Sequence, residues 1–226
     1  MQTEKITERI VSWLKDYAQK ANVKGYIIGV SGGVDSGVVS TLCAMTGLKV
    51  IAVEMPIRQK ADQVNRALEH IQFLENKFPN VEGKSVDLNE PFEALYKTFD
   101  VKDDEFPAEK LAFANTRARL RMLTLYYYGQ INGLLVCGTG NKVEDFGIGF
   151  YTKYGDGGVD VSPIADLYKT EVYALARSLD LPESIKNAIP TDGLWDVDRT
   201  DEQQIGATYP ELEKIQKEWG TKSEAD

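Results

Sequence analysis

The chain has 226 residues, a net charge of −9 and a single histidine, His70. The acidic balance argues against a nucleic-acid-binding protein, which usually carries a basic face. One histidine argues against histidine-based zinc sites and Ser-His-Asp catalysis, and no apolar run approaches the length of a membrane span.

Strand-like and helix-like segments alternate along the chain. Apolar runs predict strands at 25–30, 49–55, 83–88 and 134–138, and helical spacing predicts helices at 3–21, 36–46, 60–77, 90–98, 108–131, 168–179 and 209–219. Residues 150–160 and 191–201 are expected to form loops, and 184–188 a further turn. Alternating βα units imply a parallel sheet. We therefore expect a single-domain α/β fold over residues 1–226, Rossmann-like, with helices on both faces of the sheet.

The most informative segment is the turn Ser31-Gly32-Gly33-Val34-Asp35-Ser36, which joins the first strand to the next helix. Adjacent glycines let the backbone turn tightly and bring its N–H groups against an anion. The start of the helix adds free N–H donors and the positive end of a dipole. The turn therefore predicts a phosphate site; the alternative is an ordinary strand-to-helix turn with a Ser or Asp cap.

The same turn lacks the lysine with which a GxxxxGK[ST] loop reaches the outer phosphates of a nucleotide. Asp35 and Ser36 stand in its place. A carboxylate beside bound phosphate repels it unless a cation lies between them, and Mg²⁺ prefers carboxylate, phosphate and water oxygens. Asp35 therefore predicts a magnesium ion that accompanies the nucleotide.

The S-G-G-V-D-S segment resembles the pyrophosphatase loop of the ATP-pyrophosphatase (adenine nucleotide alpha-hydrolase-like) superfamily. Members of that superfamily bind ATP, split it between the α- and β-phosphates and transfer AMP to a substrate oxygen. Several families share the loop, so this resemblance implies the half-reaction and leaves the product open.

Ligands of parallel sheets bind beyond the carboxyl ends of the strands, so active side chains should gather there. The second strand ends at Glu54-Met55-Pro56, and the fourth ends at Gly138-Thr139-Gly140-Asn141, with Glu144 and Asp145 soon after. Glu144 is placed to be a second oxygen ligand of magnesium. Spacing alone slightly favours a plain turn and a solvated helical glutamate.

The segment Thr152 to Asp160, T-K-Y-G-D-G-G-V-D, closely resembles the T-K-Y-G-D-G-G-x-D signature of NAD synthetases. Other motifs follow in family order: N-T-R-A-R-L-R-M at 115–122, C-G-T-G-N-K-V-E at 137–144, S-P-I-A-D-L-Y-K-T-E-V at 162–172 and I-P-T-D at 189–192. The resemblance implies amidation of nicotinic acid adenine dinucleotide by ammonia, dependent on ATP and Mg²⁺. The reaction passes through an acyl-adenylate and gives NAD, AMP and pyrophosphate.

The resemblance also implies roles for individual residues. The positions that match ATP-binding residues of the family are Gly29, Ser31, Gly32, Gly33, Val34, Asp35, Ser36, Thr139, Lys169 and Thr191. Asp35 and Glu144 match magnesium ligands, and Arg119, Lys153 and Asp160 match positions that bind the deamido dinucleotide. Taken alone, Lys169 would be interpreted as a helix-surface lysine and Thr191 as a turn or cap residue.

Asp156 is the candidate for handling the nucleophile. At neutral pH ammonia is mostly ammonium, which cannot attack an acyl centre. A carboxylate near that centre could hold ammonium and accept its proton. The position of Asp156 within the 152–160 signature motivates this hypothesis.

The nitrogen source and the partners follow from length and resemblance. Glutamine-dependent relatives carry an additional amidohydrolase domain, for which this sequence has no space before Ser31, so free ammonia or ammonia from a separate protein is expected. The family implies a homodimer; the helix 108–131 has enough apolar surface, although burial against the sheet explains that surface equally well. No secretory leader opens the chain, so a cytoplasmic location is expected, with small-molecule substrates and neither nucleic acid nor membrane as partner.

Two departures from the family stand out. Glu54 occupies a position beside the adenine at which members commonly carry Arg, and Glu cannot supply the same cationic stacking. Many members end in a His-Lys segment that closes over the acceptor; this sequence lacks it, so either it is shortened or another element substitutes.

Three alternative functions remain for comparison. A GMP synthetase-like core would amidate xanthosine monophosphate and gives no reason for the 152–160 signature. An RNA-thiolating enzyme would need reactive cysteines and a basic face. A non-catalytic adenine-nucleotide sensor has no use for two magnesium carboxylates.

Overall fold

The computed structural model describes residues 2–99, 107–188 and 200–223. Thr191 and most of the loop expected at 191–201 lie outside these ranges. The strands are β1 (Gly25–Gly29), β2 (Lys49–Glu54), β3 (Val81–Ser85) and β4 (Leu134–Val136). The helices are α1 (Thr3–Lys20), α2 (Val34–Met45), α3 (Ala61–Lys77), α4 (Asn89–Thr98), α5 (Pro107–Asn132), α6 (Lys169–Ser178), α7 (Glu183–Lys186), α8 (Asp201–Ile205) and α9 (Tyr209–Ser223).

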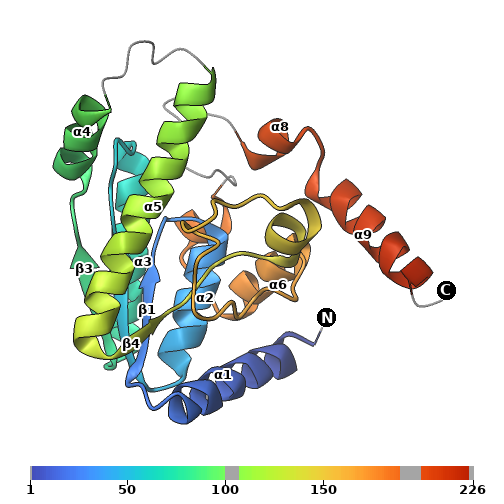
Figure 1. The fold of residues 1–226 in the computed structure, drawn as a ribbon. Helices are drawn as coiled ribbons and strands as arrows, with labels where there is room; N and C mark the ends of the chain where they lie inside the picture. Colours follow the sequence, from blue (N-terminus) through green and yellow to red (C-terminus); the bar gives the residue numbers. More distant parts are fainter. Residues whose placement is uncertain (1, 100–106, 189–199, 224–226) are drawn as a thin grey trace.

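The strands form one parallel sheet in the order β3-β2-β1-β4, which confirms the α/β class (Figure 1). The central strand β1 is a run of five residues, of which the first four are buried. Such an unbroken apolar run suits a strand that is covered on both faces. Because β1 lies between β2 and β4, its carboxyl end sits at the centre of the edge where ligands bind in these folds.

Helices cover both faces of the sheet, as the alternating pattern predicts. On one face, Tyr26 and Ile28 of β1 pack with buried side chains of α1, α2 and α6, and α3 packs on Ala52 of β2. On the other face, Ile27 and Val53 pack with α4 and α5 (Figure 1). Successive side chains of a strand point to opposite faces, and the two sets of core residues follow that period.

Two segments differ from their expected form. β3 begins at Val81 and ends at Ser85, upstream of the expected 83–88, because its register with β2 pairs Val50 with Val81 and Glu54 with Ser85. Residues Lys142–Ile148 form one π-helical segment, η1, so Glu144 is helical as the plain interpretation expects, but in a π-helix. Single π-helical turns are frequent at functional sites.

No helix in residues 2–99, 107–188 and 200–223 is both long enough and apolar enough to cross a lipid bilayer.

The only histidine is a core residue that supports the start of α2. His70 of α3 is fully buried, and its Nε2 lies 2.9 Å from the Ser40 hydroxyl. Ser40 in turn donates to the carbonyl oxygens of Ser36, at 2.7 Å, and Gly37. Through Ser40, His70 therefore supports the first turn of α2, which follows the glycine-rich turn. Its position in the core gives it a structural role.

This burial predicts an acid-sensitive contribution to stability. Burial lowers the pKa of His70 to about 4, from an ordinary value of 6.5. The unfolded chain then binds the proton more readily than the folded protein does. The contribution of neutral His70 to the free energy of unfolding is therefore complete above pH 6.5 and is lost as the pH falls toward 4. Relative to a His70→Gln variant, the free energy of unfolding of the wild type should fall by about 3 kcal/mol across this window. Urea unfolding at a series of pH values measures it; parallel curves for the two proteins would contradict it.

Candidate active site

The turn between β1 and α2 has the shape that an anion site requires. Gly32 adopts a positive φ of 83°, and α2 begins two residues later with no side-chain cap on its N–H groups. The Gly33 N–H donates to Ser31 Oγ at 3.2 Å, and Ser36 Oγ donates to the Gly33 carbonyl at 3.0 Å. These bonds hold the turn in shape while leaving the first N–H groups of α2 available to an anion.

Neighbouring backbone also presses close to this turn. A Cβ at Gly32 would lie 2.9 Å from the carbonyl oxygen of Gln63 in α3. Glycine is therefore required at this position for two reasons: its φ is positive, and the backbone of α3 leaves no room for a Cβ atom.

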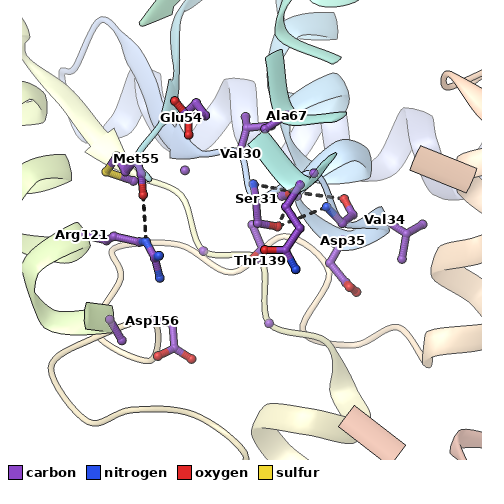
Figure 2. Close-up of a pocket in the computed structure, with 18 of the residues that line it drawn as sticks. Val30, Ser31, Val34, Asp35, Glu54, Met55, Ala67, Arg121, Thr139 and Asp156 are labelled. Atoms are coloured by element: carbon purple, nitrogen blue, oxygen red, sulfur yellow. Dashed lines mark hydrogen bonds between the residues drawn. The ribbon is translucent and has the colours of Figure 1, made fainter. Parts of the chain in front are cut away.

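The turn forms one side of a cavity of about 280 Å³. Residues at the carboxyl ends of β1, β2 and β4 line it, together with side chains of α3, α5 and α6. Its lining includes Gly29, Ser31, Gly32, Gly33, Val34, Asp35, Ser36, Glu54, Arg121, Thr139, Glu144, Asp145, Asp156 and Lys169. Figure 2 shows Asp156 below Arg121, across the cavity from Val30 and Ser31. The cavity thus gathers every predicted ATP-binding residue that the structure describes.

Lys169 joins the two predicted magnesium ligands. Its Nζ donates to Asp35 Oδ2 at 2.6 Å and to Glu144 Oε1 at 2.9 Å. The side chains of Lys169, Asp35 and Glu144 are only 3%, 17% and 14% exposed. Interpreting Lys169 as a surface lysine or Glu144 as a solvated glutamate is therefore wrong.

Two residues without a predicted role complete this cluster. Asn141, fully buried, donates from Nδ2 to Asp35 Oδ1 at 3.2 Å, while its Oδ1 accepts the N–H groups of Val143 and Glu144 and so caps η1. The Tyr209 hydroxyl donates to Glu144 Oε1 at 2.6 Å. Asn141 lies inside the 137–144 motif, and its place in that motif is the sequence signal that could have identified it. Nothing in the local sequence marks Tyr209, which approaches from α9.

The charges of this cluster stabilise one another. Burial alone would lower the pKa of Lys169, but Asp35 and Glu144 outweigh burial and raise it, so the side chain stays an ammonium ion. Burial opposes ionisation of Glu144, but Lys169 and the Tyr209 hydroxyl lower its pKa. For Asp35, burial dominates and raises the pKa, with Lys169 acting against it. One buried cation thus serves two buried carboxyl groups, an arrangement in which removal of the cation is costly.

Two more carboxyl groups line the cavity. Asp156 Oδ1 accepts the N–H of Thr152 at 3.0 Å, which fixes the side chain within its loop. Burial, followed by repulsion from Asp156, Glu144 and Asp35, raises the pKa of Asp145 to about 7. The cavity therefore concentrates negative charge, as a site for cations or for a metal-bound nucleotide would.

The residues predicted to bind the dinucleotide lie apart from this lining. Arg119 is exposed and donates from Nε to the Lys153 carbonyl at 3.1 Å. Asp160 accepts the Tyr126 hydroxyl at 3.1 Å and the Val136 N–H at 2.7 Å. Arg119 and Lys153 are thus brought together at the α5 surface, and both Asp160 oxygens are held by the chain itself. Thr191 lies outside the described residues.

Glu54 faces the same cavity from the end of β2. It is 3% exposed, and the Ser85 hydroxyl donates to its Oε2 at 2.7 Å. Burial raises its pKa. Arg121 of α5 also lines the cavity and donates to the Met55 carbonyl at 3.1 Å (Figure 2). A guanidinium group therefore lies on this side of the cavity, although it comes from a helix and not from the strand end.

The parallel sheet, the glycine-rich turn at its central strand and the carboxylate-bound cation beside it define a nucleotide-binding α/β protein of the ATP-pyrophosphatase type. Comparison with known proteins then gives the family. The family model described as NAD synthase matches residues 6–226. The chain belongs to the NAD synthase family, whose known reaction is ATP-dependent amidation of nicotinic acid adenine dinucleotide to NAD. It is thus a ligase that forms a carbon–nitrogen bond.

Individual relatives agree with this assignment. The chain is 42% identical to an NH(3)-dependent NAD(+) synthetase of Carboxydothermus hydrogenoformans, over 93% of this chain and 84% of that protein. It is 38% identical to the corresponding protein of Finegoldia magna, over 94% and 84%.

Solved structures agree in fold. An NMN synthetase from Francisella tularensis superposes with a TM-score of 0.86 at 32% identity, covering 96% of this chain and 87% of that one. An NH3-dependent NAD synthetase from Campylobacter jejuni gives 0.72 at 33% identity, covering 82% and 77%.

The shape of the turn can be tested with two glycines that share a positive φ. Gly32→Ala should weaken ATP binding by about tenfold or more, because the new methyl group strains the backbone and displaces either the turn or α3. Gly47→Ala is the matched control, because Gly47 has a φ of 71° but open space around its Cβ position. Titration calorimetry with a nonhydrolysable ATP analogue measures both. Equal affinities in the two variants would show that the turn does not hold the nucleotide.

Proposed function

We propose that this chain amidates a nicotinate carboxylate in two half-reactions, and that Asp35 and Glu144 would hold the magnesium ion that accompanies ATP. ATP first transfers AMP to the carboxylate oxygen and releases pyrophosphate. Ammonia then attacks the acyl carbon, and AMP leaves. The observation that carries the proposal is the convergence of two buried carboxyl groups on one cation beside the glycine-rich turn.

The donor set suits magnesium that arrives with a nucleotide. The described part of the chain has no group of three or more His, Cys, Asp or Glu side chains that could hold a metal by themselves. Mg²⁺ is usually bound by one or two carboxylates, with substrate phosphates and water completing its shell. Asp35 and Glu144 would hold it, and it would supply neutralisation of the charge that develops on the bridging phosphate oxygen.

The remaining groups of the cavity would hold the nucleotide and exclude competing reactions. The N–H groups of the first turn of α2 would bind the β- and γ-phosphates, and later pyrophosphate. Lys169 would place a compact positive charge against the same phosphates. Thr139 is half-buried at the end of β4 and would donate to the nucleotide.

Asp156 is the proposed acceptor of the ammonium proton. It lines the cavity on the wall opposite the glycine-rich turn, and the Thr152 N–H fixes its carboxylate. A substrate carboxylate activated between these walls would lie between AMP and Asp156. A positioned base typically contributes about 10²–10⁴-fold to the rate of such a step.

Replacing this base should separate the two half-reactions. Asp156→Asn should slow amide formation by about 100-fold or more while ATP–pyrophosphate exchange continues. Rapid-quench assays of each half-reaction measure the effect, with Asp16→Asn on the exposed side of α1 as control. Amide formation that survives while adenylation fails would rule out this role for Asp156.

Ammonia is the proposed nitrogen source, free or delivered by a separate protein. Cys43 and Cys137 are free and buried, and their sulfurs lie 3.5 Å apart. Burial, together with Cys43, raises the pKa of Cys137 well above its usual value. A glutaminase nucleophile needs the opposite, an accessible thiol with a lowered pKa.

A second acceptor is supported by one comparison. The structure with a TM-score of 0.86 is an NMN synthetase, whereas the NAD synthetase of Campylobacter jejuni gives 0.72. The second candidate function is therefore amidation of nicotinic acid mononucleotide, by the same adenylation chemistry. An acceptor of that kind has no adenylate half to place at the α5 surface, where Arg119 and Lys153 lie.

One assay tests both candidates. The protein is mixed with ATP, Mg²⁺ and ammonium, and with either the dinucleotide or the mononucleotide acid; AMP, pyrophosphate and amide are then quantified. The proposal expects all three in equal amounts, with the dinucleotide preferred. Preference for the mononucleotide would select the second candidate, and ADP with orthophosphate would contradict both.

A homodimer through α5 is the proposed assembly. Leu123, Tyr127 and Ile131 are 67%, 61% and 62% exposed, and their spacing of four places them on one face of the helix. Arg119 lies one turn earlier along the same face, so an acceptor bound there would approach the partner subunit.

A charge on this face should break the dimer. Leu123→Glu is expected to shift the protein from dimer to monomer in sedimentation velocity, because it buries a carboxylate in an apolar contact. Leu68→Glu, at a 41% exposed position on α3, is the control and should leave the assembly unchanged. A wild-type protein that sediments as a monomer would remove the proposal.

A further inference from the structure

The ammonium group of Lys169 lies where the proposed magnesium ion would lie. It contacts Asp35 Oδ2 at 2.6 Å and Glu144 Oε1 at 2.9 Å, so it bridges the two carboxylates that are assigned to the metal. Other donors fill the surroundings, because Asn141 donates to the second Asp35 oxygen and Tyr209 to Glu144 Oε1. Each carboxylate is thus already bonded to cationic or neutral donors of the chain.

We propose that Lys169 occupies the magnesium site of the nucleotide-free enzyme, and that Mg²⁺ enters only when ATP phosphates draw the lysine away. This inference rests on the proposed function, which assigns magnesium to Asp35 and Glu144. It adds an order of events: the metal binds together with the nucleotide and not before it.

The exchange follows from the space and charge of the site. Mg²⁺ needs its carboxylate ligands at about 2.0–2.1 Å and gives up water reluctantly. An ammonium group bonded to both carboxylates covers the same oxygens. A divalent ion placed beside it would also meet a positive charge in a poorly hydrated pocket, where charges interact strongly.

The position of Lys169 in its helix fits a lysine that is held for exchange. It is the first residue of α6, and a cation at a helix N-terminus opposes the helix dipole. Its side chain is nevertheless almost fully buried, and the ring of Tyr209 lies 5.0 Å from Nζ. Its bonds to the Asp35 and Glu144 carboxylates hold the ammonium group there. A divalent ion that competes for these carboxylates, together with a phosphate that competes for the ammonium group, can therefore release it.

Bound phosphate supplies the alternative partner for the ammonium. Lys169, the glycine-rich turn and Glu144 line the same cavity. A lysine side chain has four rotatable methylene groups and three donors, so it can turn from carboxylate to phosphate without moving α6. The carboxylates are then free for Mg²⁺, and every negative group named here keeps a cationic partner after the exchange.

Manganese binding without nucleotide tests the exchange. Mn²⁺ replaces Mg²⁺ as an oxygen-bound ion, and electron paramagnetic resonance measures the free ion directly. Lys169→Met, free of nucleotide, should bind Mn²⁺ at least about tenfold more tightly than the wild type, because its two carboxylates have lost their ammonium. Adding Glu144→Gln to that variant should abolish the gain. Lys15→Met, on the exposed side of α1, is the matched control.

A second measurement does not depend on the folding of the Lys169 variant. Without nucleotide, Glu144→Gln alone should leave the weak Mn²⁺ affinity of the protein unchanged, because Lys169 already blocks the site. A drop in affinity caused by Glu144→Gln would overturn the exchange, as would equal affinities of the wild type and Lys169→Met.

A different measurement tests the assignment of magnesium to Asp35 and Glu144, separately from the exchange. With a nonhydrolysable ATP analogue present, Asp35→Asn should weaken Mn²⁺ binding by about tenfold or more. If it does not, the assignment of magnesium to Asp35 is wrong. If it does, while nucleotide-free Mn²⁺ affinity is the same with and without Lys169, only the exchange is wrong.

Discussion

One buried ammonium group holds the active edge of the sheet together. Lys169 from the start of α6 bonds to Asp35 at the start of α2 and to Glu144 in η1, three segments that are far apart in the sequence. Two carboxyl groups buried side by side repel one another and lose hydration, so neither would stay ionised without a cation between them. The geometry of the proposed nucleotide site therefore depends on a cation between Asp35 and Glu144, which in this structure is the Lys169 ammonium.

The sheet brings these segments into reach. β1 lies between β2 and β4, so the glycine-rich turn after β1 and the Gly138-Thr139-Gly140-Asn141 segment after β4 leave the same edge side by side. Asn141 then connects them, because it bonds to Asp35 and caps η1, which carries Glu144. His70 of α3 supports the first turn of α2 through the Ser40 hydroxyl, which donates to the Ser36 carbonyl. Packing of the core thus fixes the carboxylates before any ligand arrives.

The sequence predicted the parts of this site that local pattern determines. The apolar run before Ser31 and the glycines after it specify strand, turn and helix, so the sheet and the shape of the glycine-rich turn follow from spacing. The burial of Glu144 does not follow, because it depends on Lys169, 25 residues later, and on Tyr209 of α9. For the same reason spacing favoured a solvated glutamate and a surface lysine. Asp160 shows the converse, since its motif predicts a ligand while both of its oxygens bond within the chain.

Diffraction from crystals grown with Mn²⁺ and a nonhydrolysable ATP analogue would test the account most directly, because anomalous scattering locates the metal without assumption. We expect one manganese ion bound by Asp35, Glu144 and phosphate oxygens, with Lys169 Nζ moved from the carboxylates onto the phosphates beside Gly33. Manganese at another position, with Lys169 still bonded to both carboxylates, would contradict the account.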